Sequence, residues 1–367
     1  MVLLAGVAIS AVSAAALPGQ PANAPERLAA TIVPASLPVI GKVDERYQSY
    51  NVESVEVTGG NFWAPYPRPG DKPREAVAGP HGTEFATGAY QRREPLDLRG
   101  NKRLRLMTRA LGPAYMRVSG SWANNIWFQD DDRPPAEPPK GYQGVLTRAQ
   151  WAGVVEFGRH VDAKILTSFA TNAAARTPDG TWDPEGARRL FAYTRSLGGR
   201  IDAVELSNEP NMRQPTYPAD VFARDIAALR NLVERVSPET LVVGPASTGE
   251  AGFMLFDVPP EIATTARLLS GSPTPQFDVF SHHFYGAVSQ RCKSLGERPG
   301  MQRNVNTSAA EALSEAWLSR ADQGQGYYRK MRDRFAPGKP IWITETAQTA
   351  CGGDPWSSTF LDSFRYV

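Results

Sequence analysis

The sequence predicts an α/β fold, namely a (β/α)8 barrel of the TIM type. Apolar, β-favouring segments alternate with helical segments along most of the 367 residues, a pattern that favours a parallel sheet with connecting helices. Two of the β segments, residues 203–209 and 341–345, each end on a glutamate, and the carboxyl ends of barrel strands converge on one face. We find seven such strands where a closed barrel has eight, so an open doubly wound sheet is the structural alternative.

The N-terminus is apolar. Val2 to Leu17 are almost all apolar or small, and the first charged side chain is Glu26. We interpret residues 1–24 as a secretory signal or leader. A membrane anchor is the alternative, although the run is short for a span.

The next stretch, residues 25–43, is interpreted as the N-terminal strand segment of an accessory β domain. Its β-favouring runs are short and are interrupted by Pro34 and Pro38, which confines them to the edge of a sheet. The barrel is assigned to residues 44–367. We expect it to be incomplete at its C-terminus, because no eighth strand follows the seventh.

The barrel strands are predicted from β-favouring runs that are bounded by turn residues. The first ends at Glu53, and Val55 to Val57 are taken as its extension. The fourth must end at about Glu209, because Pro210 cannot continue a strand ladder. The predicted strands are residues 46–53, 114–118, 164–169, 203–209, 241–244, 278–284 and 341–345.

The helices are predicted from apolar residues that recur at helical spacing. Pro184 stands at a plausible first helical position, where its missing N–H group is not needed. The proline- and glycine-rich residues up to Leu98 and the segment 130–141 are predicted loops. The predicted helices are residues 101–111, 147–161, 183–197, 219–236, 311–335 and 357–367.

Composition narrows the possible partners. The net charge is +2, so nothing global favours a nucleic acid or a membrane surface. After the N-terminal run, no stretch is long and apolar enough to cross a bilayer. We expect a secreted or periplasmic monomer with no nucleic-acid partner, no membrane span, no cofactor and no metal.

The two terminal glutamates indicate glycoside hydrolysis. Retaining hydrolysis needs two carboxyl groups about 5–5.5 Å apart, of which one attacks and the other exchanges a proton. We assign Glu345 as nucleophile and Glu209 as acid/base, and we expect Asn208 to bond the sugar 2-hydroxyl. The alternative is that each glutamate is a satisfied charge at a strand end. Because two such glutamates occur, at strands four and seven, we favour a catalytic role over this alternative.

Four motifs, in this order along the chain, resemble those of glycoside hydrolase family 79, the heparanase and β-glucuronidase family. The combination of His-His-Phe-Tyr with a late Gly-Gly narrows the resemblance to the family, whereas Asn-Glu-Pro marks only the larger clan of retaining barrels. The chain resembles a bacterial heparanase-like member of the family, and we expect the chain to be truncated at its C-terminus. The motifs are residues 112–120 (Gly-Pro-Ala-Tyr-Met-Arg-Val-Ser-Gly), 205–211 (Glu-Leu-Ser-Asn-Glu-Pro-Asn), 281–286 (Ser-His-His-Phe-Tyr-Gly), and 342–346 (Trp-Ile-Thr-Glu-Thr) with 351–353 (Cys-Gly-Gly).

The resemblance implies the same roles for the paired glutamates and adds others. Tyr285 implies a hydroxyl beside the nucleophile, and Glu53 implies a carboxyl group for sugar hydroxyls. Gly352 and Gly353 imply backbone amides that receive a uronate carboxylate, and glycine suits such a close approach. The family also implies a carboxylate-binding tyrosine beyond the eighth strand, which this chain does not reach.

Histidines and cysteines supply two further predictions. His282 and His283 are adjacent on a strand and therefore point to opposite faces, so we favour a hydrogen-bonding role for His283 over a metal site. Cys292 follows the sixth strand and Cys351 the seventh, so loops at one barrel face could join them in a disulfide. Two unrelated thiols are the alternative.

The predicted function is that of a secreted retaining β-glucuronidase of heparanase type. It would cut internally in glycosaminoglycans such as heparan sulfate, which would be its partners. A basic group after the sixth strand could meet sulfate or carboxylate groups, although solvated loop charges are the alternative for each member. The other functions considered are an exo-acting β-glucuronidase and a non-catalytic glycan-binding protein. The basic group is Arg291, Lys293, Arg298 and Arg303.

Overall fold

A computed structural model describes most of the chain, which divides into two compact units, Met1–Val43 and Asp44–Val367. In the described part of the first unit there is one 3-10 helix, η1 (Pro34–Ser36), and no strand. Residues 33–39 and 41–43 thus contain none of the predicted strands, and the assignment of residues 25–43 to an accessory β domain stays a prediction. The described residues are 33–39, 41–72, 74–79, 88–133, 137–254, 258, 262–292, 308–312 and 314–356.

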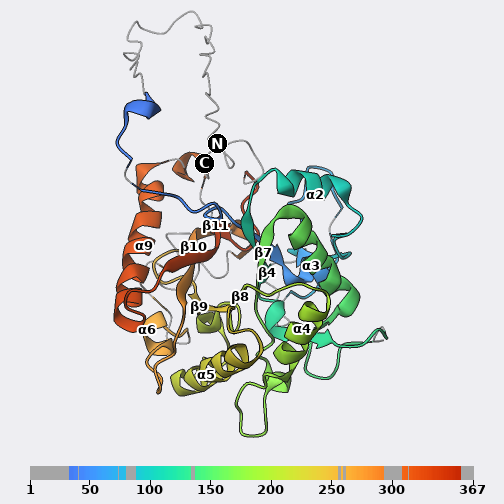
Figure 1. Cartoon of the computed structure of the whole chain (residues 1–367). Coiled ribbons are helices and arrows are strands. Elements are labelled where there is room, and N and C mark those ends of the chain that lie inside the picture. Colours follow the sequence, from blue (N-terminus) through green and yellow to red (C-terminus); the bar gives the residue numbers. More distant parts are fainter. Residues whose placement is uncertain are drawn as a thin grey trace, which may run out of the picture. The chain divides into compact units, whose positions relative to one another are not determined.

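The second unit is built on a seven-stranded sheet whose neighbouring strands are all parallel (Figure 1). Asn51 Nδ2 on the first strand donates to Thr344 O on the last strand at 3.2 Å, so the sheet is a nearly closed barrel. The predicted barrel is confirmed in these strands. In spatial order they are β1 (Tyr50–Glu53), β4 (Ala114–Ser119), β7 (Ala163–Thr167), β8 (Ala203–Val204), β9 (Leu241–Ser247), β10 (Val279–Val288) and β11 (Ile341–Ala350).

Helices connect successive barrel strands and lie around the outside of the sheet, as Figure 1 shows for α3, α4, α5 and α9. The predicted helix at residues 219–236 is confirmed at both ends, and the one at residues 357–367 lies outside the described residues. The helices are α1 (Ser54–Thr58), α2 (Lys102–Arg109), α3 (Arg148–Val161), α4 (Glu185–Ser196), α5 (Ala219–Val236), α6 (Thr265–Leu268), α8 (Ala309–Ala312) and α9 (Glu315–Phe335).

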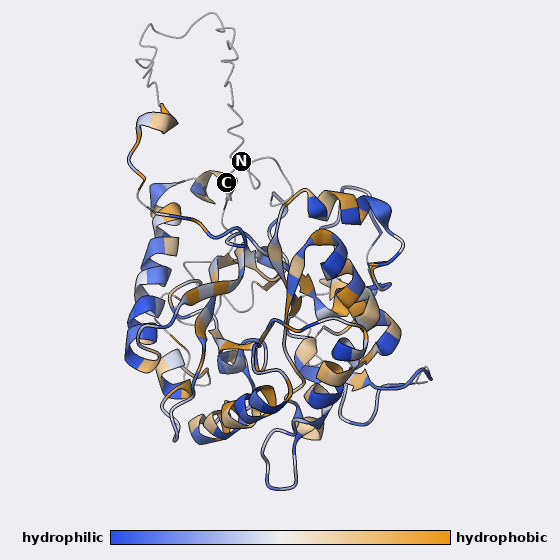
Figure 2. Cartoon of the chain, viewed as in Figure 1, coloured by the Kyte–Doolittle hydropathy of each residue, from blue (hydrophilic) through white to orange (hydrophobic). Residues whose placement is uncertain are grey.

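The helices that pack on the sheet begin and bury apolar faces for local reasons. Thr147 Oγ1 accepts a hydrogen bond from Gln150 N at the start of α3, and Gln150 Oε1 accepts one from Thr147 N, which completes a capping box. The apolar face of α5 buries Phe222 and Leu229, each of which stabilises the fold by about 1.5–3 kcal/mol. Figure 2 shows α9 as mostly hydrophilic, which matches its few buried residues.

Several elements differ from the sequence prediction. Residues 54–58 form α1 rather than a strand extension, because the Glu53 and Glu56 side chains cap this turn reciprocally. The predicted loop up to Leu98 contains an antiparallel pair, and the segment around 130–141 is bracketed by a parallel pair. These pairs are β2 (Gly60–Trp63) with β3 (Tyr90–Arg93), and β5 (Ile126–Gln129) with β6 (Gly144–Thr147).

The fourth barrel strand is shorter than predicted. It leaves the regular ladder after Val204, although Glu205 N still donates to Thr167 O and Leu206 O accepts from Phe169 N. In the described part of the chain, no helix combines the length and the apolar character needed to span a membrane.

Candidate active site

The two predicted glutamates come together at the barrel. Glu345 lies in β11 in register with His283 of β10. Glu209 follows β8 with φ 45° and ψ 56°, a left-handed conformation just before η5 (Pro210–Met212). One oxygen of each carboxylate and a His283 nitrogen all lie within 4.8 Å of one another. A left-handed backbone is strained for a residue with a Cβ, and such strain is typical of functional sites.

His283 lies between the two carboxylates. Its Nδ1 is 3.0 Å from Glu209 Oε1 and 3.9 Å from Glu345 Oε2. An ionised carboxylate only accepts hydrogen bonds, so Nδ1 donates to Glu209 when that group is ionised. The imidazole is fully buried, whereas the Glu209 and Glu345 side chains are 19% and 14% exposed, so both carboxylates remain reachable.

Arg117 of β4 holds the centre of the site. Its guanidinium donates to Glu345 Oε2 at 2.7 Å and to Glu205 Oε2 at 2.9 Å. It also donates to Asn208 Oδ1 and Asn51 Oδ1, each at 2.9 Å. Arg117 is 3% exposed and Glu205 1%. Burial by itself would lower the pKa of Arg117, but the charges of Glu205 and Glu345 raise it, so the group stays cationic.

Glu345 is held in its ionised form. Burial alone would raise its pKa, but the charges of His283 and Arg117 and the hydrogen bond from Tyr285 lower it below the ordinary value. The Tyr285 hydroxyl donates to Glu345 Oε1. Burial, followed by the negative charges of Glu345 and Glu209, raises the pKa of Tyr285, so this hydroxyl keeps its proton. The family resemblance implies a Tyr285 hydroxyl beside Glu345, and the structure places it there.

Glu53 ends β1 and adds a further, half-buried carboxyl group to the site. Burial, and next the charge of Glu345, raises its pKa well above the ordinary value. Its Oε2 has no hydrogen-bond partner among the described residues. Gly120 leaves the space for this oxygen, because a Cβ at Gly120 would lie 1.6 Å from it. A neutral Glu53 can donate a hydrogen bond, which is the chemistry that a sugar hydroxyl can accept.

Asn208 is fixed by hydrogen bonds on both its side chain and its backbone. Its Oδ1 accepts from Arg117, and its Nδ2 donates to Ser121 Oγ at 3.3 Å. Asn124 Oδ1 accepts from Asn208 N, and Asn124 Nδ2 donates to Asn208 O, each at 2.9 Å. One hydrogen of Nδ2 is left for a ligand.

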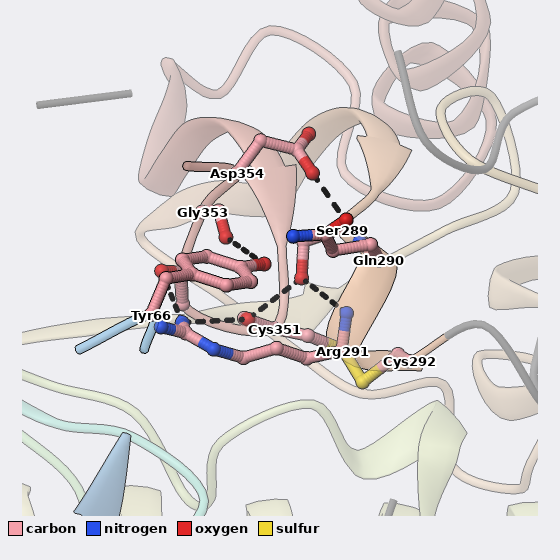
Figure 3. Close-up of a disulfide and its surroundings, with 9 residues drawn as sticks. Tyr66, Ser289, Gln290, Arg291, Cys292, Cys351, Gly353 and Asp354 are labelled. Carbon is pink, nitrogen blue, oxygen red and sulfur yellow. Dashed lines mark hydrogen bonds between the residues drawn. A yellow bond between two sulfur atoms is a disulfide. The ribbon is translucent and has the colours of Figure 1, made fainter. Parts of the chain in front are cut away.

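Cys351, Gly352 and Gly353 form a turn directly after β11. All three have φ in the left-handed region, at 66°, 71° and 77°. Cys351 is joined to Cys292 by a disulfide, which ties this turn to the loop after β10 (Figure 3). The turn after β11 and the loop after β10 are therefore covalently connected.

Arg291 does not project as a free rim charge. It is 9% exposed, and its guanidinium donates to Gly352 O at 2.6 Å and to Ala64 O. The guanidinium also stacks 4.0 Å over the Tyr66 ring. Arg291 is therefore not a solvated loop charge, and its predicted action on sulfate or carboxylate groups stays a prediction. Lys293, Arg298 and Arg303 lie outside the described residues.

Sequence reasoning gave no role to several residues that build the site. Arg117 stands within an apolar strand, and Glu205 stands two residues after the start of another. A charge in such a run signals a buried ion pair, because a lone buried charge is strongly disfavoured. Asn51 and Asn124 carry no comparable signal, since asparagine is common in exposed turns.

Glu209, His283 and Glu345 also form a group that could hold a metal ion. Arg117 already supplies a positive charge 2.7 Å from Glu345, which disfavours a second cation there. A cavity of about 210 Å³ lies elsewhere, between β5, α3 and α4, and contains neither glutamate of the pair.

Comparisons with known proteins bear on this site. The profile of "Glycosyl hydrolase family 79, N-terminal domain" matches residues 94–367. Heparanase from Mus musculus is 24% identical over 319 residues, covering 73% of this chain and 54% of heparanase. Inactive heparanase-2 from Homo sapiens is 22% identical over 335 residues, covering 72% and 52%. The chain thus spans about half the length of the curated relatives it matches. The α-L-arabinofuranosidase from Thermotoga maritima, solved as an arabinose complex, aligns with a TM-score of 0.44 at 15% identity, covering 68% and 49%.

Proposed function

Because the chain belongs to glycosyl hydrolase family 79, we propose that it is a secreted, retaining β-glucuronidase. The observation that carries this proposal is the separation of the two carboxylates. Oxygens of Glu209 and Glu345 lie within 4.8 Å, which fits the about 5–5.5 Å of retaining sites better than the about 6.5–9.5 Å of inverting ones.

The mechanism starts from Glu345, whose surroundings keep it ionised. Ionised Glu345 attacks the anomeric carbon and forms the new C–O bond, while Glu209 gives its proton to the leaving oxygen as the glycosidic bond breaks. Glu209 then takes a proton from water, which attacks the same carbon and displaces Glu345. Arg117 and Tyr285 contact both oxygens of Glu345 and hold it in place.

Glucuronide specificity is supported by the turn after β11. Gly352 and Gly353 follow one another in left-handed conformations, and successive amides of this kind bind anions. A uronate carboxylate would be received there. Asn208 would bond the 2-hydroxyl, and neutral Glu53 another hydroxyl of the same sugar. The expected substrates are glycosaminoglycans such as heparan sulfate.

The stereochemistry of the first product tests the proposal. We expect 4-nitrophenyl β-D-glucuronide to release β-glucuronic acid first, as seen by proton NMR before the anomers equilibrate. Glu345→Gln and Glu209→Gln should each abolish most of the rate, whereas Glu45→Gln, at a side chain that is 68% exposed, should not change it. Release of the α-anomer first would reject retention, and an inactive wild type would reject the enzyme.

Two alternatives are separated by further measurements. Heparan sulfate that shortens to intermediate fragments supports internal cleavage, whereas intact polymer with free glucuronic acid supports exo action. A non-catalytic glycan-binding protein is the other alternative, favoured by the similarity to inactive heparanase-2. This alternative predicts that Glu345→Gln leaves polymer binding unchanged and that neither the wild type nor the variant cuts the polymer.

A further inference from the structure

The Cys351–Gly353 turn is held through its three consecutive carbonyl oxygens. Ser289 Oγ donates to Cys351 O at 2.9 Å, and Arg291 Nη1 donates to Gly352 O at 2.6 Å. The Tyr66 hydroxyl donates to Gly353 O at 2.8 Å. Figure 3 shows these side chains gathered around the turn, with Tyr66 from one segment and Ser289 and Arg291 from another.

These contacts also fix the directions of two amides. In a trans peptide plane, the C=O of one residue and the N–H of the next point in opposite directions. The bond to Cys351 O therefore orients the Gly352 N–H group, and the bond to Gly352 O orients the Gly353 N–H group. Within the described ranges, neither amide donates a hydrogen bond of its own.

The side chains that orient the turn are themselves rigid and buried. Ser289 is 0% exposed and Arg291 is 9% exposed. Arg291 is further fixed by its bond to Ala64 O and by its position over the Tyr66 ring. Burial lowers the pKa of Arg291, whereas the charges of Tyr66 and Asp354 raise it. The guanidinium bonded to Gly352 O places a positive charge beside the turn, which favours an anion there.

We propose that Ser289 and Arg291 are positioning residues that make this turn selective for a carboxylate over a neutral group on the sugar. Ser289 is too buried to touch a sugar, so it acts only by orienting the Gly352 amide. Arg291 orients the Gly353 amide and supplies charge. The inference rests on the proposed glucuronidase function, because it assigns the residues that select the acidic sugar.

The test compares acidic and neutral substrates on the full chain. We would measure kcat/KM for 4-nitrophenyl β-D-glucuronide and for 4-nitrophenyl β-D-glucoside with Ser289→Ala and Arg291→Met. Each variant should lower the glucuronide-to-glucoside ratio about tenfold, chiefly through KM for the glucuronide. Arg291→Lys, which keeps the charge but not the planar fork, should recover part of the ratio.

The matched control is Arg46→Met. Arg46 also donates to two backbone carbonyls, Ala114 O and Asp162 O, but these lie where β4 and β7 begin, at the opposite ends of these strands from the site. The Arg46→Met variant should leave the glucuronide-to-glucoside ratio of kcat/KM unchanged. Equal losses on both substrates, or an unchanged ratio in Ser289→Ala, would show that these residues only stabilise the fold.

Failure of the proposed function gives a different result. In that case the wild type shows no preference for the glucuronide, and NMR titration detects no tighter binding of D-glucuronate than of D-glucose. That outcome rejects the acidic-sugar site together with its positioning residues. A wild type that prefers the glucuronide, with variants that keep the preference, rejects the positioning role alone.

Discussion

Arg117 Nη1 donates to Glu345 Oε2 at 2.7 Å, so the proposed nucleophile is bound to an arginine that also pairs with buried Glu205. Arg117→Met would leave Glu205 buried without its counter-charge. We expect a loss of about 3–5 kcal/mol in the free energy of unfolding, measured by urea denaturation. The double variant with Glu205→Gln should recover much of that stability but not the activity, since Glu345 would still lack its donor.

A control for this prediction is Arg230→Met. Arg230 pairs with Asp278 at 3.3 Å, and the two side chains are 27% and 30% exposed. A partly exposed pair of this kind contributes at most about 1 kcal/mol. If Arg117→Met cost no more than Arg230→Met, the Arg117 network would not be a structural centre.

Tyr285→Phe removes one of the groups that keep Glu345 ionised. Burial alone would raise the pKa of Glu345, and the hydrogen bond from Tyr285 is among the contacts that lower it. The acid limb of the pH profile of kcat/KM should therefore move to higher pH by about one pH unit. Tyr327→Phe is the matched control, because Tyr327 donates to Glu250 at 2.7 Å outside the site. A shift in both variants would contradict the assignment.

Glu53→Gln should stabilise the protein at neutral pH. The folded state raises the pKa of Glu53, so its contribution to stability is present below the unfolded value of about 4.5 and is lost as pH rises toward the folded value. The difference in unfolding free energy, variant minus wild type, should therefore grow between pH 5 and pH 8. Glu45→Gln, at an exposed side chain, should show no such growth. A constant difference for Glu53→Gln would mean that this carboxyl is ionised throughout.

Gly120→Ala should damage the site as well as the backbone. Gly120 has φ 98°, and an added Cβ would lie 1.6 Å from Glu53 Oε2. Gly112 has φ 86° with nothing within 4 Å of the same position, so Gly112→Ala isolates the backbone penalty of about 1–3 kcal/mol. We expect only Gly120→Ala to lose activity as well as melting temperature. Equal activity in the two variants would show that Glu53 is not needed where it lies.

The Cys292–Cys351 bond closes a chain separation of 59 residues. A loop of this length corresponds to a stabilisation of roughly 4 kcal/mol in the chain-entropy treatment. Reduction should therefore lower the melting temperature, and neither thiol should react with a maleimide under denaturing, non-reducing conditions. Labelling of both thiols would show that the disulfide is absent from the protein.

The barrel could be predicted because its signals are local. Residues 219–236 carry apolar positions at helical spacing, and the helix formed there has those bounds. Strand ends were less certain: β8 ends at Val204 and β11 extends to Ala350. Ladder pairing with neighbouring strands sets these limits, and it depends on residues far away in the chain. The β2–β3 pair was missed for the same reason.

By itself, the sequence determined the alternation of strands and helices, the choice of Glu209 and Glu345 as a carboxylate pair, and the family motifs, whereas Glu345 lies inside β11 and Glu209 lies after the end of β8. These features follow from residue type and spacing along one segment. Only the tertiary structure decided that Arg117 contacts Glu345 and Glu205, and that buried Arg291 holds the turn rather than facing solvent. Contacts between side chains on different strands depend on barrel closure and sheet register, and no local pattern encodes where a buried charge finds its partner.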